Sequence, residues 1–316
     1  MAKILITGAN GYLGGRIAEY LLNQGHELHL GVRSQSSAHV LQKLLPEAKT
    51  LNFDLQAPDS FPQALKNQDC VIHLAALNHQ QCLENPSLAQ QVNSEAVGEL
   101  LVQTGKAGIQ HFIYASTFHV YEPGEFITEE SPTGTKSVYA QTHLDAEKYI
   151  EQYCLTHKLS GTVLRLSNAL GPPLSPEVNA WSLVANDLCR QAISAKKLQL
   201  QSHGLQERNF IAISDLSRAF AHLITSKSSQ YDFECFNLGG ENAISIRSLA
   251  QSIQHLCLQH CNYRPELIIP EADAHAKQQQ TLTFSSAKFL NTGFTYEKSV
   301  EDELKENLLF CQRHFS

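Results

Sequence analysis

Three glycines near the start of the chain stand at three-residue spacing. The strand-like run Lys3–Thr7 leads straight into Gly8, and an amphipathic stretch begins at Tyr12, between Gly11 and Gly14. Glycines between a strand and a helix permit a tight turn and let backbone N–H groups approach a pyrophosphate at the helix N-terminus. The pattern therefore predicts a dinucleotide-binding loop, with an ordinary strand–helix turn as the alternative interpretation.

The end of the next expected strand, Leu30-Gly31-Val32-Arg33-Ser34, bears on the type of dinucleotide. A carboxylate at such a position would hydrogen-bond the ribose 2′-hydroxyl and favour NAD, whereas an arginine suits a 2′-phosphate. The sequence places Arg33 there and has no Asp or Glu nearby. It therefore predicts NADP, with NAD as the alternative cofactor and a solvated surface arginine as the alternative role of Arg33.

Four potential metal ligands gather late in the chain, at His255, Cys257, His260 and Cys261. They fall within an expected amphipathic helix, Ile246–Leu258, and just beyond its end. A structural metal site takes four ligands, and no second ligand pair is evident here. The sequence therefore predicts no metal site.

Ser116, His119 and Asp145 have the residue types of a hydrolase triad. In the common α/β-hydrolases the nucleophile stands in a G-x-S-x-G turn, which this sequence lacks. We therefore discount a hydrolase.

The elements that must position these residues alternate through the first half of the chain. Expected strands are Lys3–Thr7, Glu27–Val32, Cys70–Ala75, Phe112–Ser116 and Thr162–Leu166. Expected helices are Tyr12–Gln24, Ser87–Ala107 and Tyr139–His157. Strands separated by helices imply crossover connections and a parallel sheet covered on both faces. The predicted fold class is therefore α/β, a doubly wound parallel sheet of the modified Rossmann type.

The alternation ends after Asn168, because Gly171-Pro172-Pro173 and Ser175-Pro176 cannot continue a helix or a central strand. We assign residues 1–168 to a dinucleotide-binding domain, which the chain rejoins at about 209–240, through 209–226 and 235–238. Residues 169–208 and 241–316 are expected to form a smaller C-terminal substrate domain.

The composition limits the class of protein. The 316 residues include 24 basic and 31 acidic side chains, for a formal charge of −7. This acidic balance argues against a nucleic-acid partner, which needs a basic surface. No apolar run approaches the roughly 18 residues of a membrane helix, and no leader typical of a signal peptide is present. The eight cysteines lack a disulfide-framework spacing, so we expect a cytoplasmic globular protein with free thiols and no membrane partner.

Further motifs follow the glycine loop in order along nearly the whole chain. They are Asp54-Leu55, His73-Leu74-Ala75-Ala76, Asn93, Ala115-Ser116-Thr117-Phe118-His119-Val120-Tyr121, Arg165-Leu166-Ser167-Asn168, Gly171-Pro172, Arg208-Asn209-Phe210-Ile211, Asp215-Leu216 and Phe236-Asn237-Leu238-Gly239-Gly240. This ordered set resembles the extended short-chain dehydrogenase/reductase family of nucleotide-sugar epimerases, dehydratases and reductases. The motifs are specific for the superfamily and not for a substrate.

The resemblance implies which residues contact the ligands. The implied cofactor-binding residues are Gly8, Asn10, Gly11, Tyr12, Leu13, Gly14, Arg33, Asp54, Leu55, Leu74, Ala75, Ala76, Asn93 and Ser116. The implied substrate-binding residues are Phe118, His119, Asn168 and Arg208, the last because a cation suits a diphosphate. The resemblance also implies a small-molecule substrate of the nucleotide-sugar type and a homodimer formed through the helices Ser87–Ala107 and Tyr139–His157.

The family's catalytic pair, a tyrosine and a lysine four residues later, corresponds to Tyr139 and His143, which share one helix face. The lysine normally holds the nicotinamide ribose and favours the tyrosinate by its charge. Histidine can donate a hydrogen bond to the ribose, but it is shorter and mostly neutral at pH 7. Lys148 lies about 180° round the helix from Tyr139 and cannot substitute. The resemblance places the hydroxyl that contacts the reacting oxygen on Thr117.

Three explanations of His143 follow. It serves in a working but altered enzyme, or the chain keeps the cofactor for structure or sensing, or a different mechanism uses His119 to carry the proton. The preferred hypothesis is an NADP-linked (alternatively NAD-linked) oxidoreductase or epimerase/dehydratase with Thr117, Tyr139 and His143 as its catalytic residues. The alternative is a weakly active or inactive regulator that senses NADP(H).

Overall fold

A computed structural model describes residues 1–135, 137–225, 232–270 and 282–316. The last position of the predicted segment 209–226 and residues 271–281 of the predicted substrate domain lie outside the described residues. The chain divides into two compact units. The first comprises Met1–Pro123, Glu129–Leu166 and Ser217–Asn237, and the second Gly124–Thr128, Ser167–Leu216 and Leu238–Ser316.

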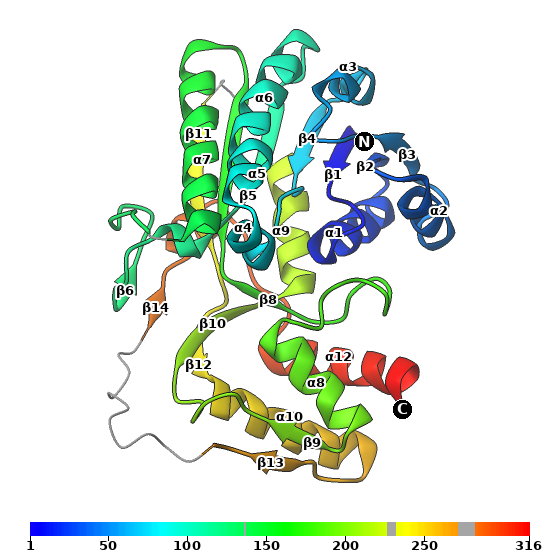
Figure 1. The fold of residues 1–316 in the computed structure, drawn as a ribbon, viewed down its shortest axis with the longest axis vertical. Coiled ribbons are helices and arrows are strands. Elements are labelled where there is room, and N and C mark those ends of the chain that lie inside the picture. The colour runs from blue at the N-terminus through cyan, green and yellow to red at the C-terminus, as the bar shows by residue number, and fades with distance from the viewer. Residues whose placement is uncertain (136, 226–231, 271–281) are drawn as a thin grey trace. The chain divides into compact units, whose positions relative to one another are not determined.

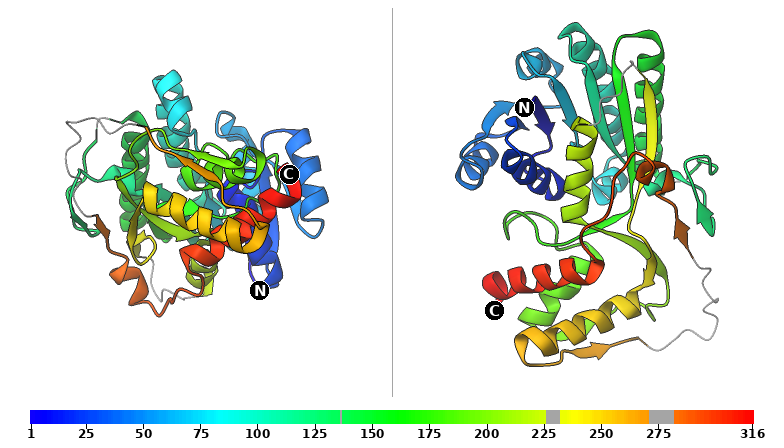
Figure 2. Two further views of the ribbon diagram at one scale, coloured as in Figure 1. Left: turned by 90° about the horizontal axis from the view of Figure 1, so that it is seen from below. Right: turned by 180° about the vertical axis from the view of Figure 1, so that it is seen from behind.

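The first unit is built on a seven-stranded sheet with the strand order β11-β7-β5-β4-β1-β2-β3. Strand β1 pairs in parallel with both β2 and β4, β4 pairs in parallel with β5, and β5 with β7. In the rear view of Figure 2 the sheet runs from blue strands on one side to yellow β11 on the other. The strands are β1 Lys3–Thr7, β2 Glu27–Val32, β3 Lys49–Asn52, β4 Cys70–His73, β5 His111–Thr117, β7 Ser160–Leu166 and β11 Phe233–Leu238.

Helices connect these strands, and α6 and α7 lie side by side along the sheet (Figure 1). They are α1 Tyr12–Asn23, α2 Gln35–Leu44, α3 Phe61–Leu65, α4 His79–Glu84, α5 Pro86–Gln90, α6 Ala96–Lys106, α7 Val138–Thr156 and α9 Ile213–Thr225. Short 3-10 turns occupy Pro58–Ser60 and Phe118–Val120. The parallel sheet with its crossover helices confirms the predicted α/β fold class.

The predicted helix Ser87–Ala107 is not one regular α-helix. It divides into α5, a π-helical turn at Gln91–Glu95 and α6. A π-helical turn inserts one extra residue and rotates the side chains that follow. This rotation affects Asn93, which lies in the turn.

One large apolar cluster of the first unit lies between the sheet and the helices α3, α5, α6 and α7. Fully buried members include Val71, Phe112, Leu100, Ile150 and Val163. Burial of apolar side chains on this scale is the main favourable contribution to folding. It fixes α7 against β5 and β7.

The second unit contains three small sheets and four helices among its described residues. Strands β12, β10 and β8 form one sheet, β13 pairs with β9, and β14 pairs with β6. The strands are β6 Phe126–Ile127, β8 Asn168–Leu170, β9 Lys197–Gln199, β10 Glu207–Ala212, β12 Ala243–Ser245, β13 Glu266–Ile268 and β14 Thr283–Phe284. The helices are α8 Val184–Ser194, α10 Ile246–Cys261, α11 Ala287–Leu290 and α12 Val300–Phe315. Helices α8, α10 and α12 pack on one another around an apolar cluster that includes Leu188, Ile253 and Leu308 (Figure 1).

The structure places residues 209–216 in the second unit, whereas the sequence assigned them to the first. The reason is strand pairing: β10 pairs in parallel with β8 and antiparallel with β12, both of the second unit. The short segment Gly124–Thr128 also belongs to the second unit, through the pairing of β6 with β14. None of the helices in the described part of the chain combines the length and apolar character needed to cross a bilayer.

Candidate active site

The strand order reverses beside β1. From β1 the chain first builds β2 and β3 on one side, and then β4, β5, β7 and β11 on the other. In doubly wound sheets the ligand-binding crevice lies at the carboxyl ends of the strands where the order reverses. In this unit those ends are Thr7 on β1 and His73 on β4.

The glycine loop follows the carboxyl end of β1. Gly8 has a φ of +69°, and its carbonyl accepts a hydrogen bond from the N–H of Gly11 at 2.9 Å. A Cβ on Gly8 would lie 2.8 Å from the backbone nitrogen of Ala75, so only glycine fits between the ends of β1 and β4. Gly11 is the N-cap of α1 and supplies no side-chain cap. The start of α1 thus has no side-chain cap, an arrangement that suits an anionic ligand at a helix N-terminus.

A pocket opens beside this loop, and nine of the predicted cofactor residues line it. They are Gly8, Asn10, Gly11, Arg33, Asp54, Leu55, Leu74, Ala75 and Ala76. Further lining residues that the sequence did not single out are Gly31, Val32, Phe53, Gln56, Leu77, Gln81 and Val92. The pocket lies wholly within the first unit.

Three predicted cofactor residues lie in the first turn of α1 outside the lining. Tyr12 and Leu13 are half-buried, and Gly14 is buried. A Cβ on Gly14 would collide with the carbonyl oxygen of Gly8. Gly14 therefore serves the close packing of α1 against the loop.

Asn93 lies behind the pocket wall. Its Oδ1 accepts the backbone N–H of Leu77 at 2.7 Å, and its Nδ2 donates to the carbonyl of Leu77 at 3.1 Å. The amide oxygen and the amide nitrogen of this buried side chain thus both hydrogen-bond to the backbone of Leu77. Asn93 therefore shapes the wall and is not among the pocket-lining residues.

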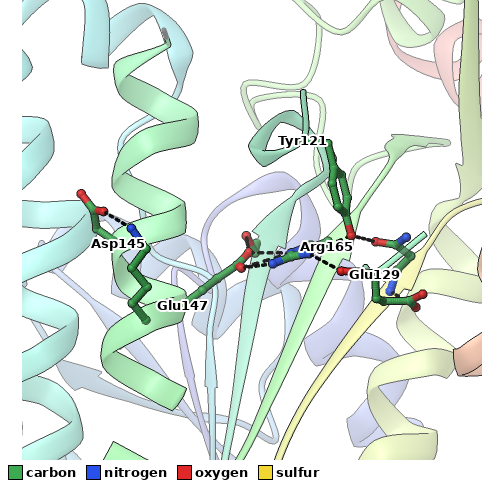
Figure 3. Close-up of polar contacts among 8 residues, drawn as sticks. Tyr121, Glu129, Asp145, Glu147 and Arg165 are labelled. Carbon is green, nitrogen blue, oxygen red and sulfur yellow. Dashed lines mark hydrogen bonds and ion pairs between the residues drawn. The ribbon is translucent and has the colours of Figure 1, made fainter. Parts of the chain in front are cut away.

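Ser116 was predicted to contact the cofactor, but its hydroxyl donates to the buried carboxylate of Glu147. Glu147 forms an ion pair with Arg165, whose Nη2 lies 2.6 Å from Oε2. Figure 3 shows the guanidinium of Arg165 between Glu147 of α7 and Tyr121, whose hydroxyl accepts from Nη1 at 2.8 Å. The structure therefore assigns Ser116 to this buried ionic cluster.

Asp145 points away from this cluster on the other side of α7 (Figure 3). Its Oδ1 lies 3.4 Å from the Nζ of Lys148 and accepts from Gln141 at 2.9 Å. With Ser116 directed to Glu147 and Asp145 directed outward, the three residue types of a hydrolase triad are not assembled.

Tyr139 and Thr117 meet at the start of α7. Their hydroxyls form a hydrogen bond, and Thr117 also accepts the backbone N–H of His119 at 3.2 Å. Burial raises the pKa of Tyr139 to about 12, and the hydrogen bond from Thr117 opposes that rise. Tyr139 is therefore protonated at neutral pH.

His143 lies one turn further along α7, with its ring 4.6 Å from that of Tyr139. It is 3% exposed, and burial lowers its pKa to about 4, so the imidazole is neutral. Its Nδ1 lies 2.6 Å from the hydroxyl of Tyr114 on β5. Its Nε2 is buried and has no hydrogen-bond partner among the described residues.

Two exposed histidines also flank the ring of Tyr139. The ring centroid of His79 lies 6.1 Å away and that of His119 6.4 Å away, both edge-on. The ring of Phe118 packs 4.1 Å from that of His119. His119 therefore lies beside Tyr139, with Phe118 packed against it, and a substrate contact for either residue stays a prediction.

The other two predicted substrate residues belong to the second unit. Asn168 begins β8, and its Nδ2 donates to the carbonyl of Asn209 at 2.9 Å. Arg208 is an exposed residue of β10. The side-chain amide of Asn168 thus donates one hydrogen bond that joins β8 to β10.

No group of three or more His, Cys, Asp or Glu among the described residues could hold a metal ion. The four residues considered as metal ligands from the sequence, His255, Cys257, His260 and Cys261, do not form such a group. Cys257 is buried in the core of the second unit, while His255 is exposed and hydrogen-bonds to Gln259 at 2.8 Å.

Tyr114 and Glu147 were not singled out from the sequence, and Arg165 was named only as part of a motif without a role of its own. A signal for Glu147 was present, because it follows Tyr139 and His143 at four-residue spacing and so shares their helix face. Tyr114 stands two residues before Ser116 and faces α7 with it, but no sequence pattern shows which helix residue it meets.

Comparisons with known proteins identify the family of this chain. The sequence model of the NAD dependent epimerase/dehydratase family matches residues 4–239. An uncharacterized UDP-glucose epimerase of Bacillus subtilis is 26% identical over 93% of this chain and 96% of its own length. A UDP-glucuronate 4-epimerase of Thermodesulfobacterium geofontis is 28% identical over 81% of both chains.

Solved structures share the fold at lower identity. A UDP-glucose 4-epimerase of Thermotoga maritima, solved with UDP-glucose, superposes with a TM-score of 0.83 at 19% identity, covering 99% of this chain and 100% of that one. A UDP-glucuronic acid 4-epimerase of Bacillus cereus, solved with UDP-glucuronic acid and NAD, gives 0.82 at 20% identity, covering 98% and 99%. These likenesses confirm the fold.

Proposed function

Because the chain belongs to the NAD-dependent epimerase/dehydratase family, we propose that it is a working but altered enzyme of that family. It binds a nicotinamide dinucleotide in the pocket beside β1 and β4 and acts on a nucleotide-linked sugar or a similar hydroxyl or carbonyl compound. The relatives named above act on UDP-sugars, which supports this substrate class.

The features of the pocket fit a dinucleotide. The positive φ of Gly8, the missing space for a Cβ and the uncapped start of α1 suit a pyrophosphate. The observation that carries the proposal is the buried Nε2 of His143, which lacks a partner next to the hydrogen-bonded Tyr139 and Thr117. A buried polar group without a partner is costly, so a bound hydroxyl of the ribose is the expected acceptor.

The chain's own residues supply the proton chemistry and the positioning. The bound nicotinamide would give or accept the hydride. Tyr139, protonated at neutral pH, donates its proton to a carbonyl oxygen that is being reduced and takes it back in the reverse direction. Thr117 directs its hydroxyl toward the same oxygen, and neutral His143 holds the ribose without supplying a charge.

We assign the cofactor as NADP. Arg33 is exposed at the end of β2 and lines the pocket. It is followed by the N-terminus of α2, where the hydroxyl of the N-cap Ser34 accepts the backbone N–H of Ser37 and lies 3.0 Å from the Ser37 hydroxyl. A cation, hydroxyl donors and a helix N-terminus together suit a 2′-phosphate. Asp54, which also lines the pocket, accepts the N–H of Gln56 at 3.0 Å.

We also expect a homodimer formed through α6 and α7. The apolar residues Val97, Leu101 and Ile150 are buried in the core. Val102 on α6 and Tyr149 and Leu155 on α7 are instead 36%, 40% and 76% exposed, so these apolar residues are available to a second copy. Light scattering of the purified chain should give twice the monomer mass, and a monomer mass at high concentration would refute the dimer.

The proposal is tested by identifying the nucleotide that the freshly purified protein releases on denaturation, followed by titration with NADPH and NADH. Binding that prefers NADPH supports the assignment. Retained NAD(H) would show the role given to Arg33 to be wrong, and binding of neither would refute the proposed enzyme.

The neutral state of His143 favours a second candidate, an NADP(H)-binding regulator with little turnover, because a sensor needs no charge beside Tyr139. Addition of sugar nucleotides to the cofactor-loaded protein distinguishes the two. The enzyme changes the absorbance of the nicotinamide, whereas the regulator leaves it unchanged.

A further inference from the structure

Tyr114 is a fully enclosed tyrosine at the centre of the sheet. It lies on β5, is 2% exposed and stacks against the imidazole of His73 on β4, with ring centroids 5.8 Å apart. Its hydroxyl lies 2.6 Å from Nδ1 of His143. No other hydrogen bond of this hydroxyl is found in the described part of the chain.

The position of the proton in this hydrogen bond follows from counting buried donors and acceptors. A neutral imidazole has one donor and one acceptor nitrogen. If the Tyr114 hydroxyl donates to Nδ1, only the Nε2–H of His143 is left without a partner. If Nδ1–H donated instead, the Tyr114 hydroxyl proton and the Nε2 lone pair would both be buried without partners. The first arrangement is favoured because it leaves fewer unsatisfied groups.

Burial acts in the same direction on both residues. It raises the pKa of Tyr114 well above its usual value and lowers that of His143 to about 4. The phenol therefore keeps its proton and the imidazole takes up no second one. Neither the tyrosinate form of Tyr114 nor the imidazolium form of His143 is populated in the physiological pH range.

A comparable hydroxyl fixes the neighbouring imidazole. Thr7 accepts the backbone N–H groups of Leu74 and Ala75, each at 3.2 Å, and lies 2.8 Å from Nδ1 of His73. With its lone pairs used, Thr7 donates to Nδ1. His73 therefore also carries its proton on Nε2, and no second imidazole lone pair competes for the Tyr114 hydroxyl.

We propose that Tyr114 is a positioning residue, whose hydroxyl donates to Nδ1 of His143 and so keeps the imidazole proton on Nε2. This inference rests on the proposed contact between His143 and the cofactor ribose. An Nε2–H donor binds a ribose hydroxyl through the oxygen lone pair, so the ribose keeps its own proton for Tyr139. Tyr114 thereby replaces, in part, what a lysine would provide through its several donors.

The first test reads the tautomer directly in the cofactor-free protein. Nitrogen-15 NMR of ring-labelled histidine, with the His143 signals assigned by their loss in His143→Gln, should show the proton on Nε2. In Tyr114→Phe the same signals should shift toward a mixture of tautomers. Tyr121→Phe is the matched control, because it removes another buried hydroxyl of the same unit and should leave His143 unchanged. A proton on Nδ1 in the unmodified protein would overturn the inference.

The second test measures NADPH binding. Tyr114→Phe should weaken binding about five-fold, the scale of one hydrogen bond, and should have little effect when His143→Lys is already present, because an ammonium has no tautomers. If His143→Ala weakens binding but Tyr114→Phe does not, the positioning role is refuted while the ribose contact stands. If neither substitution weakens binding, the ribose contact of the proposed function is itself refuted.

Discussion

The buried ion pair between Glu147 and Arg165 provides the sharpest stability prediction. Their side chains are only 4% and 10% exposed. Arg165 donates to Glu147 from Nε at 3.1 and 3.2 Å and from Nη2 at 2.6 Å, and Ser116 adds a further donor (Figure 3). Glu147→Gln keeps the volume of the side chain but removes its charge.

The cost follows from what remains in the structure. Arg165 would keep its charge in a buried position, with an amide NH₂ group in place of one carboxylate oxygen. Breaking a buried ion pair by neutralising one partner costs about 3–5 kcal/mol. Since total stabilities are commonly about 5–15 kcal/mol, a large part of the free energy of unfolding would be lost.

Urea denaturation at neutral pH measures this loss, and α7 offers a matched control. Asp145→Asn makes the same kind of charge change two residues earlier, in the exposed pair with Lys148 at 3.4 Å. That variant should lose less than about 1 kcal/mol. The double variant Glu147→Gln, Arg165→Met should recover part of the loss because no charge remains unpaired. A Glu147→Gln variant no less stable than Asp145→Asn would refute the reasoning.

Two further predictions concern the cofactor and acid stability. Arg33→Ala should weaken NADPH binding by about 10- to 100-fold, the range for a charged hydrogen bond, and change NADH binding little; equal losses for both cofactors in titration would contradict the role of Arg33. Burial lowers the pKa of His73 to about 3 and of His143 to about 4, whereas an imidazole in the unfolded chain titrates near 6.5. The contribution of these two histidines to the free energy of unfolding is therefore fully present above about pH 6.5. At lower pH it decreases, by about 1.4 kcal/mol per pH unit for each histidine. Urea denaturation between about pH 5 and 7 should show a smaller slope for His143→Gln, and an unchanged slope would contradict the burial of a neutral imidazole.

Much of the first unit was predictable because its signals are local. The apolar runs at Lys3–Thr7 and Glu27–Val32 identify the first two strands, and the glycine loop identifies the turn from the first strand into α1. Strand β3, Lys49–Asn52, was not predicted, since it is short and polar at both ends. The segment that contains β10 was expected to rejoin the first domain, but β10 pairs with β8 and β12, and long-range pairing of this kind is not visible in the sequence.

The placement of candidate site residues was predictable where it depends only on the residue's position within one helix or strand. Tyr139 and His143 share a helix face, and Thr117 ends a strand beside them. The contact of the Ser116 hydroxyl with Glu147 could not be predicted, because it is set by how α7 packs on β5. Asn93 is turned to Leu77 from a π-helical segment, which periodicity does not indicate.

The measurement that tests the central claim most directly compares Tyr139→Phe with the unmodified protein, for both NADPH binding and hydride transfer to or from a panel of sugar nucleotides. Because the lost hydroxyl acts on the substrate oxygen, the variant should bind NADPH with nearly unchanged affinity and lose about 100-fold or more in the rate of hydride transfer. Transfer at the unmodified rate in the variant would contradict the assignment of Tyr139 as the proton-exchanging residue.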